Sequence, residues 1–403
     1  MTKSNQSSIS NKLAPLRIGI VVPHIFMQDS LLPKVIFSPG QLAIDLAEGL
    51  VAIGQKVTLF SPGPVKTVAN NLNADLSYFE KELEGRGDSY IDLLKKHPLT
   101  FISLSRQVQA ELIANAFSMA NDNLLDIVHI YTNEEDIALP FTKLCNKPVV
   151  FTHHDPFNFL INYKNIFPKY KNLNWISISL SQRKGMPVDS NWVGNIYHGL
   201  SEQKWDAGTG GDYLTYIGRI IEPKGLHLAI GAVKKYNASN ENKITLKIAG
   251  KHYAGHKKDS YWQEVIQPQI DNRYIKFVGH LNETQKAKLL RGSKALIVPS
   301  IFDEPFGMVA IEALASATPV ICLDSGALPE IIKDGATGII VSKSYKDSSI
   351  DSVQVIDELA SAIGRVGTLD RHLCRKDYEK RFTLKRMCTE YNDIYKILLK
   401  DLL

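Results

Sequence analysis

The chain has 403 residues, which predicts roughly two to three domains at about 150 residues each. Hydrophobic residues make up 44% and charged residues 22%, as in globular proteins with a large core, so wholesale disorder is excluded. The 47 Lys and Arg against 42 Asp and Glu give a net charge of +5 with both signs mixed, which argues against a nucleic-acid binder. The four cysteines have no paired spacing, so a disulfide scaffold is also excluded.

The N-terminal residues 1–14 are polar and lack the apolar core of a secretory signal. No apolar run approaches the roughly 18 residues that suggest a membrane span. We therefore expect a cytoplasmic protein. Weak peripheral membrane contact stays open, because residues 163–171 mix aromatic and basic side chains, although a solvated loop is the simpler interpretation of that segment.

The first half of the chain alternates expected strands and helices. A β-branched run at 16–23 predicts a buried strand, a loop follows to Gly40, and apolar spacing predicts a helix at 41–53 that ends at Gly54. Residues 65–105 are less periodic and predict only a helical insertion at 76–94. The other expected elements are strands at 56–60, 126–131, 147–152 and 174–179 and a helix at 108–120.

A polar stretch at 201–211, with three glycines near its end, indicates a turn or linker. The alternation restarts after it, so we predict two doubly wound α/β domains, in which ligands bind at the carboxyl ends of the strands. The expected strands are at 212–218, 244–249, 275–278, 295–299 and 319–323, and the expected helices are at 225–236, 284–291, 308–315, 358–366 and 384–399.

The stretch at 300–315 is the most informative for function. Glu304 follows an expected strand, and Pro305 delays the next helix because proline is not tolerated in a helix interior. Gly307 lets the backbone approach a ligand closely, and the free N–H groups at the helix start favour an anion. We expect Glu312 on the first turn of this helix, so that both carboxylates can reach one ligand.

Two cations and two histidines also follow expected strands. Arg219 and Lys224 stand in the loop after the first strand of the second domain, where a guanidinium fork and an ammonium would suit a diphosphate. His153 and His154 follow a strand of the first domain, and neighbouring side chains in extended backbone face opposite ways. We expect one of them to be structural and His154 to be functional. Singly, each of these residues could be an ordinary surface or core residue; together they favour ligand binding.

These stretches together resemble the retaining, nucleotide-sugar-dependent glycosyltransferases of family 4, or glycosyl transferases group 1. The resemblance spans nearly the whole chain and is strongest at 216–329. Its most specific element is the E-x7-E motif of Glu304 and Glu312. Supporting pieces are the loop at 218–225, the strand end at 277–279, the segment 319–330 and the tail at 381–395.

The resemblance implies the GT-B fold, in which two Rossmann-like doubly wound domains face each other across a cleft. Residues 1–200 would form the acceptor-side domain and residues 201–383 the donor-binding domain. The helix at 384–403 would pack back on the first domain.

The resemblance also implies roles at matched positions. Arg219 and Lys224 would bind the donor diphosphate and stabilise it as the leaving group. Glu304 would contact the donor sugar, His154 would lie near its 6-hydroxyl, and Glu312 would accept hydrogen bonds from the ribose hydroxyls. Together with Glu312, the predicted donor-binding positions are Gly40, Gly218, Leu281, Glu283, Phe306, Gly307, Met308 and Val309.

The implied reaction moves a sugar from a nucleoside-diphosphate sugar to an acceptor hydroxyl, the acceptor being a sugar, a lipid-linked molecule or a small molecule. The chain contains no Asp-x-Asp pair for a divalent cation, so we expect neither a metal nor another cofactor. Gly40 is preceded by Pro39 where the family usually has a second glycine, which leaves the approach of that loop open.

Three other classes compete. A glycogen-synthase-like or phosphorylase-like GT-B enzyme is a near relative that would normally have a longer chain. A catalytically silent GT-B binding protein is disfavoured by the intact motif residues. A dinucleotide oxidoreductase is disfavoured because the first strand is not followed by G-x-G-x-x-G.

Overall fold

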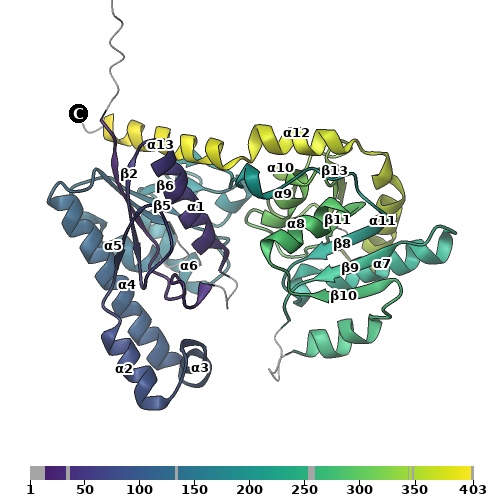
Figure 1. Cartoon of the computed structure of the whole chain (residues 1–403), viewed down its shortest axis with the longest axis horizontal. Coiled ribbons are helices and arrows are strands. Elements are labelled where there is room, and N and C mark those ends of the chain that lie inside the picture. The colour runs from purple at the N-terminus through teal and green to yellow at the C-terminus, as the bar shows by residue number, and fades with distance from the viewer. Residues whose placement is uncertain are drawn as a thin grey trace, which may run out of the picture. The chain divides into compact units, whose positions relative to one another are not determined.

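The computed structural model describes residues 14–32, 37–131, 135–252, 259–343, 345–346 and 349–400. Two parallel sheets organise the chain (Figure 1). Contacts divide it into two compact units, one of Met1–Val150 with Tyr395–Leu403 and one of Phe151–Ile394. The domain boundary at residue 200 stays a prediction. No helix among the described residues is long and apolar enough to cross a membrane.

The first sheet has seven strands in the order β3-β2-β1-β4-β5-β6-β7. Its centre is apolar: Ile18 of β1 lies opposite Val57 and Ile127 in parallel register, and all three are buried. The short strands β3 and β7 were not predicted. The strands are β1 (Arg17–Val21), β2 (Lys56–Ser61), β3 (Asn70–Asn73), β4 (Ile127–Tyr131), β5 (Val149–Thr152), β6 (Asn174–Ser177) and β7 (Trp192–Asn195).

The helices of this half correct three predictions. Helix α1 begins at Ser38 and not at residue 41, because proline is tolerated in a first helical turn, so Gly40 is buried in the helix and not in the loop. The insertion expected at 76–94 is two helices, since Gly87 ends the first with a φ of 66° and a capping box at Ser89 starts the second. The helices are α1 (Ser38–Ala52), α2 (Ser77–Arg86), α3 (Tyr90–Lys96), α4 (Pro98–Asn121), α5 (Ala138–Phe141) and α6 (Ile161–Ile166), with α4 starting ten residues before its predicted start.

The second sheet has six strands in the order β10-β9-β8-β11-β12-β13. The strands are β8 (Tyr213–Ile217), β9 (Thr245–Ala249), β10 (Ile275–Gly279), β11 (Ala295–Val298), β12 (Val320–Leu323) and β13 (Gly338–Val341), of which β13 was not predicted. A two-stranded antiparallel ribbon pairs Tyr345–Lys346 with Ser349–Ile350.

Both faces of the second sheet are covered. Ala295 and Ile297 of β11 join the core cluster under α7 and α11, whereas Leu296 and Val298 join the cluster under α9 and α12. This alternation follows from the two-residue period of a strand. The helices are α7 (Leu226–Ser239), α8 (Glu283–Arg291), α9 (Met308–Ala315), α10 (Leu328–Ile331), α11 (Ser352–Arg365), α12 (Arg371–Arg381) and α13 (Leu384–Lys400).

Three of these helices depart from the prediction, and the short α10 is one that was not expected. Helix α11 starts six residues early, because the Asp351 carboxylate caps the N–H groups of Val353 and Gln354. Helix α12 was not predicted at all. Helix α13 contributes to both units: within the first, Tyr395 is fully buried and its hydroxyl lies 2.7 Å from His129 Nδ1.

Candidate functional site

The predicted cations and the first carboxylate follow two neighbouring strands. Strands β8 and β11 are adjacent in the sheet but not consecutive in the chain, so the strand order reverses between them. In doubly wound folds, ligands bind at the carboxyl ends of the strands at such a switch point. Arg219 and Lys224 follow β8, and Glu304 follows β11.

Lys224 and Glu304 form an ion pair at this edge. Lys224 Nζ lies 2.6 Å from Glu304 Oε1, and the two side chains are only 18% and 11% exposed. The ammonium also lies 5.3 Å from the ring centroid of Phe302. The two loops are joined through the backbone, because the N–H groups of Ile301 and Phe302 both donate to the Pro223 carbonyl at 2.9 and 3.0 Å. These hydrogen bonds hold the loop that carries Lys224 next to the loop that carries Glu304.

Two glycines allow this close packing of loops. A Cβ at Gly225, where φ is +69°, would lie 1.9 Å from the Pro299 carbonyl oxygen. A Cβ at Gly326, where φ is +58°, would lie 2.2 Å from the Glu304 carbonyl oxygen and 2.4 Å from its backbone nitrogen. The N–H of Ala327 donates to the same carbonyl at 2.8 Å. The backbone of Glu304 is thus held by a segment that tolerates no side chain at residue 326.

Glu312 lies deeper than the sequence suggested. It is the fifth residue of α9 and lies past the first turn, which corrects the prediction, and only 6% of it is exposed. Lys286 Nζ on α8 lies 2.5 Å from Glu312 Oε1, whereas Oε2 is buried and has no hydrogen-bond partner among the described residues. Burial raises the pKa of Glu312, and the Lys286 charge opposes that shift.

The start of α9 presents backbone and not side chains. Gly307 precedes the helix with a φ of +114°, a conformation that favours glycine. Phe306 is 2% exposed, and its ring lies against the His198 ring with centroids 4.8 Å apart, so its side chain belongs to the core. Met308 and Val309 are half-buried on the first turn, where helical N–H groups lack partners within the helix.

The two histidines after β5 have different surroundings. His153 is fully buried against the rings of Phe157 and Phe167, as a core residue would be. His154 is 7% exposed and stacks on His198, with ring centroids 5.3 Å apart and an interplanar angle of 9°. Burial and the nearby Arg386 charge lower the pKa of His198 to about 3, so this ring is neutral.

Leu281 and Glu283, two of the predicted donor-binding positions, have different surroundings. Leu281 lines a pocket of about 670 Å³ that Tyr213 and Lys247 also line. Glu283 is not among the lining residues and pairs instead with Lys204, with 3.1 Å between Nζ and Oε2.

Arg219 and Gly218 lie at the end of β8. Arg219 is exposed, and its guanidinium makes no hydrogen bond or ion pair with any described residue, while its carbonyl accepts a hydrogen bond from the Tyr216 hydroxyl at 2.9 Å. A Cβ at Gly218 would meet that hydroxyl at 3.2 Å. Gly40 belongs to the other unit, where a Cβ would lie 2.8 Å from the Phe37 side chain.

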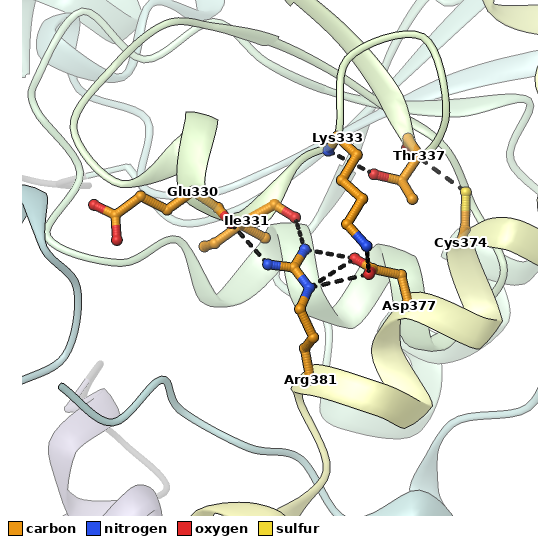
Figure 2. Close-up of polar contacts among 7 residues, drawn as sticks. All are labelled: Glu330, Ile331, Lys333, Thr337, Cys374, Asp377 and Arg381. Carbon is orange, nitrogen blue, oxygen red and sulfur yellow. Dashed lines mark hydrogen bonds and ion pairs between the residues drawn. The ribbon is translucent and has the colours of Figure 1, made fainter.

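A polar network supports the segment that holds Glu304. Arg381 of α12 pairs with Asp377 and donates to the backbone carbonyls of Glu330 and Ile331 at 2.8 and 2.5 Å (Figure 2). The Glu330 side chain points away from Arg381 in Figure 2, and its carboxylate accepts from the Tyr197 hydroxyl at 3.0 Å. Sequence reasoning missed Lys286, and it listed Glu330 only as part of a motif, because each acts through contacts between distant segments.

No three His, Cys, Asp or Glu side chains of the described residues are grouped so that they could hold a metal ion.

The two parallel sheets, both with the central strand order of a Rossmann-like domain, define a two-domain protein of the GT-B fold. Solved structures show the same fold. Sucrose-phosphate synthase from Thermosynechococcus elongatus has a TM-score of 0.70 at 15% identity, covering 96% of this chain and 100% of that one. HepE from Anabaena, in complex with UDP and glucose, has a TM-score of 0.64 at 14% identity, covering 94% and 98%.

Sequence comparison adds a family match. Residues 200–359, which carry most of the site, match the family model described as glycosyl transferases group 1. Glycogen synthase of Mycobacterium tuberculosis is 34% identical over 149 residues, which cover 36% of this chain and 34% of the synthase. The chain thus spans about a third of the length of that curated relative.

Proposed function

We propose that the protein is a glycosyltransferase that moves a sugar from a nucleoside-diphosphate sugar to an acceptor hydroxyl. The observation that carries the proposal is the buried Glu312 carboxylate, which has one oxygen without a partner among the described residues. A buried unsatisfied acceptor is costly unless a ligand supplies a donor. A ribose hydroxyl is such a donor, and the match of residues 200–359 to glycosyl transferases group 1 supports that assignment.

The cations of the β8 loop suit the diphosphate. Arg219 has an exposed guanidinium without a partner among the described residues, so it can bind two phosphate oxygens at once. Lys224 keeps two of its three N–H donors beyond the one directed at Glu304. Charge that develops on the leaving phosphate would be stabilised by these groups and by the N–H groups at the start of α9.

The remaining roles follow the resemblance. Glu304 would contact the donor sugar, and the backbone amides of Phe306, Gly307 and Met308 would hold its hydroxyls. His154 would lie near the sugar 6-hydroxyl. Gly218, Leu281, Glu283 and Val309 would complete the donor site, and the role of Gly40 stays a prediction.

We infer a retaining reaction without a metal. The bond between the anomeric carbon and the β-phosphate oxygen breaks, and the acceptor oxygen bonds to the same face of that carbon. The acceptor proton passes to the departing phosphate oxygen. UDP is the first nucleotide to test, because a structural neighbour was solved in complex with UDP and glucose.

Calorimetry with UDP and GDP tests the donor site. We expect one of them to bind, and we expect Arg219→Ala and Glu312→Ala to weaken that binding. The assignment would be wrong if neither nucleotide binds. It would also be wrong if both variants bind the nucleotide as tightly as the wild type does. A screen of nucleotide sugars, with NMR of the product anomer, then tests transfer and retention.

A further inference from the structure

Lys286 is a charged residue that none of the sequence motifs contains. It lies on α8, whose start is fixed by a capping box between Asn282 and Gln285. Its ammonium lies 2.5 Å from Glu312 Oε1 and 5.7 Å from the ring centroid of Trp205, which is 1% exposed. The Lys286 side chain is 23% exposed, so the ion pair is largely shielded from water.

The two carboxylate oxygens of Glu312 have different surroundings. Oε1 accepts from Lys286, whereas Oε2 is buried without a partner among the described residues. A carboxylate in such surroundings would otherwise tend to take up a proton, because burial disfavours the charged form. A protonated carboxyl group would present an O–H donor in place of a strong acceptor.

We propose that Lys286 is a positioning residue, which keeps Glu312 ionised and oriented so that Oε2 alone accepts hydrogen bonds from the ribose of a bound nucleotide. This inference rests on the proposed function. Lys286 itself touches no reacting atom and acts through Glu312. Its effect therefore depends on the ribose hydroxyls of the ligand and not on the phosphates.

Matched nucleotides separate this role from a structural one. Calorimetry compares UDP with 2′-deoxy-UDP and 3′-deoxy-UDP on wild type, Lys286→Met, Lys286→Arg and Glu312→Gln. We expect the wild type to bind UDP roughly tenfold or more tightly than at least one deoxy analogue, as for a hydrogen bond to a charged group. We expect Lys286→Met and Glu312→Gln to bring that ratio close to one, and Lys286→Arg to keep most of it.

The control is Lys235→Met, which removes an ion pair with Asp357 at the surface. The Lys235 and Asp357 side chains are 48% and 45% exposed, so this variant should leave the ratio unchanged. Thermal unfolding checks that each variant is folded. If Lys286→Met does not fold, Lys286→Gln makes the same comparison, because it keeps a donor and removes the charge.

The outcomes separate the two proposals. If Glu312→Gln lowers the ratio but folded Lys286→Met does not, Lys286 has no positioning role while the proposed function stands. If the wild type binds neither UDP nor GDP, the proposed function fails and this inference fails with it.

Discussion

The two ends of the segment from Glu304 to Glu312 are built on different principles. Both carboxylates pair with a lysine, at 2.6 Å for Lys224 and 2.5 Å for Lys286. Glu304 stands on a loop whose path depends on Gly326 and on backbone hydrogen bonds. Glu312 stands inside a helix, where burial determines its surroundings. The loop end is thus defined by backbone shape and the helix end by the cost of burying a charge.

This difference predicts which substitutions act on which step. Changes at the loop end should alter the reaction at the sugar and phosphate. Changes at the helix end should alter nucleotide affinity.

Lys224→Met removes a cation expected at the leaving phosphate and leaves Glu304 without its partner. We expect kcat to fall about 10²–10³-fold, as when one stabilising donor is removed from an active site. Steady-state kinetics on the donor found in the nucleotide-sugar screen measure it. Lys235→Met removes a surface ion pair and should keep kcat. Equal kinetics in Lys224→Met and wild type would contradict the role.

Glu312→Gln and Glu304→Gln should separate affinity from rate. We expect Glu312→Gln to weaken nucleotide binding about 10–100-fold, because a charged hydrogen-bond acceptor is lost. We expect Glu304→Gln to lower kcat while nucleotide affinity stays within about threefold. Calorimetry and kinetics on both variants give the comparison. The division between loop and helix ends would be wrong if both variants changed affinity equally.

Gly326→Ala tests whether backbone shape holds the loop end. Its Cβ would meet the Glu304 backbone at 2.2 Å, so we expect a loss of about 3 kcal/mol or more in the free energy of unfolding. Gly335→Ala is the matched control: its φ is +71° but no atom lies within 4 Å of the added Cβ, so about 1–2 kcal/mol is expected. Denaturant unfolding measures both, and equal losses would exclude the collision as the cause.

The smallest expected effect is on the pH dependence of stability. It comes from His198, which packs on Phe306 within the segment. Its pKa is lowered to about 3, against about 6.5 in an unfolded chain. Between those values the unfolded chain binds a proton that the folded one does not, so stability is complete above pH 6.5 and falls with pH below it. We expect His198→Phe to flatten this decline by at most about 1.4 kcal/mol per pH unit.

Urea unfolding between pH 7 and pH 4.5 measures that slope. His372→Phe, at an exposed position, is the control and should leave it unchanged. The same slope in His198→Phe and wild type would remove His198 as a contributor.

The sequence predicted most of the strands in both sheets, because short runs of β-branched residues indicate buried parallel strands. It placed Glu304 and Lys224 after the correct strands, since the carboxyl ends of parallel strands share one edge. It did not predict α12, because this helix has few apolar residues. Cys374 and Tyr378 are its buried ones. It also missed Lys286, because the contact with Glu312 joins residues 26 positions apart and leaves no local pattern.

The last helix has a consequence for synthesis. Residues from Tyr395 onward cluster with the unit that begins the chain, and Tyr395 is buried there with its hydroxyl next to His129. Domains generally fold in order of emergence from the ribosome. Here the first unit cannot bury His129 beside Tyr395 until α13 has been synthesised, so a nascent chain stalled before residue 395 would carry an incomplete core in that unit.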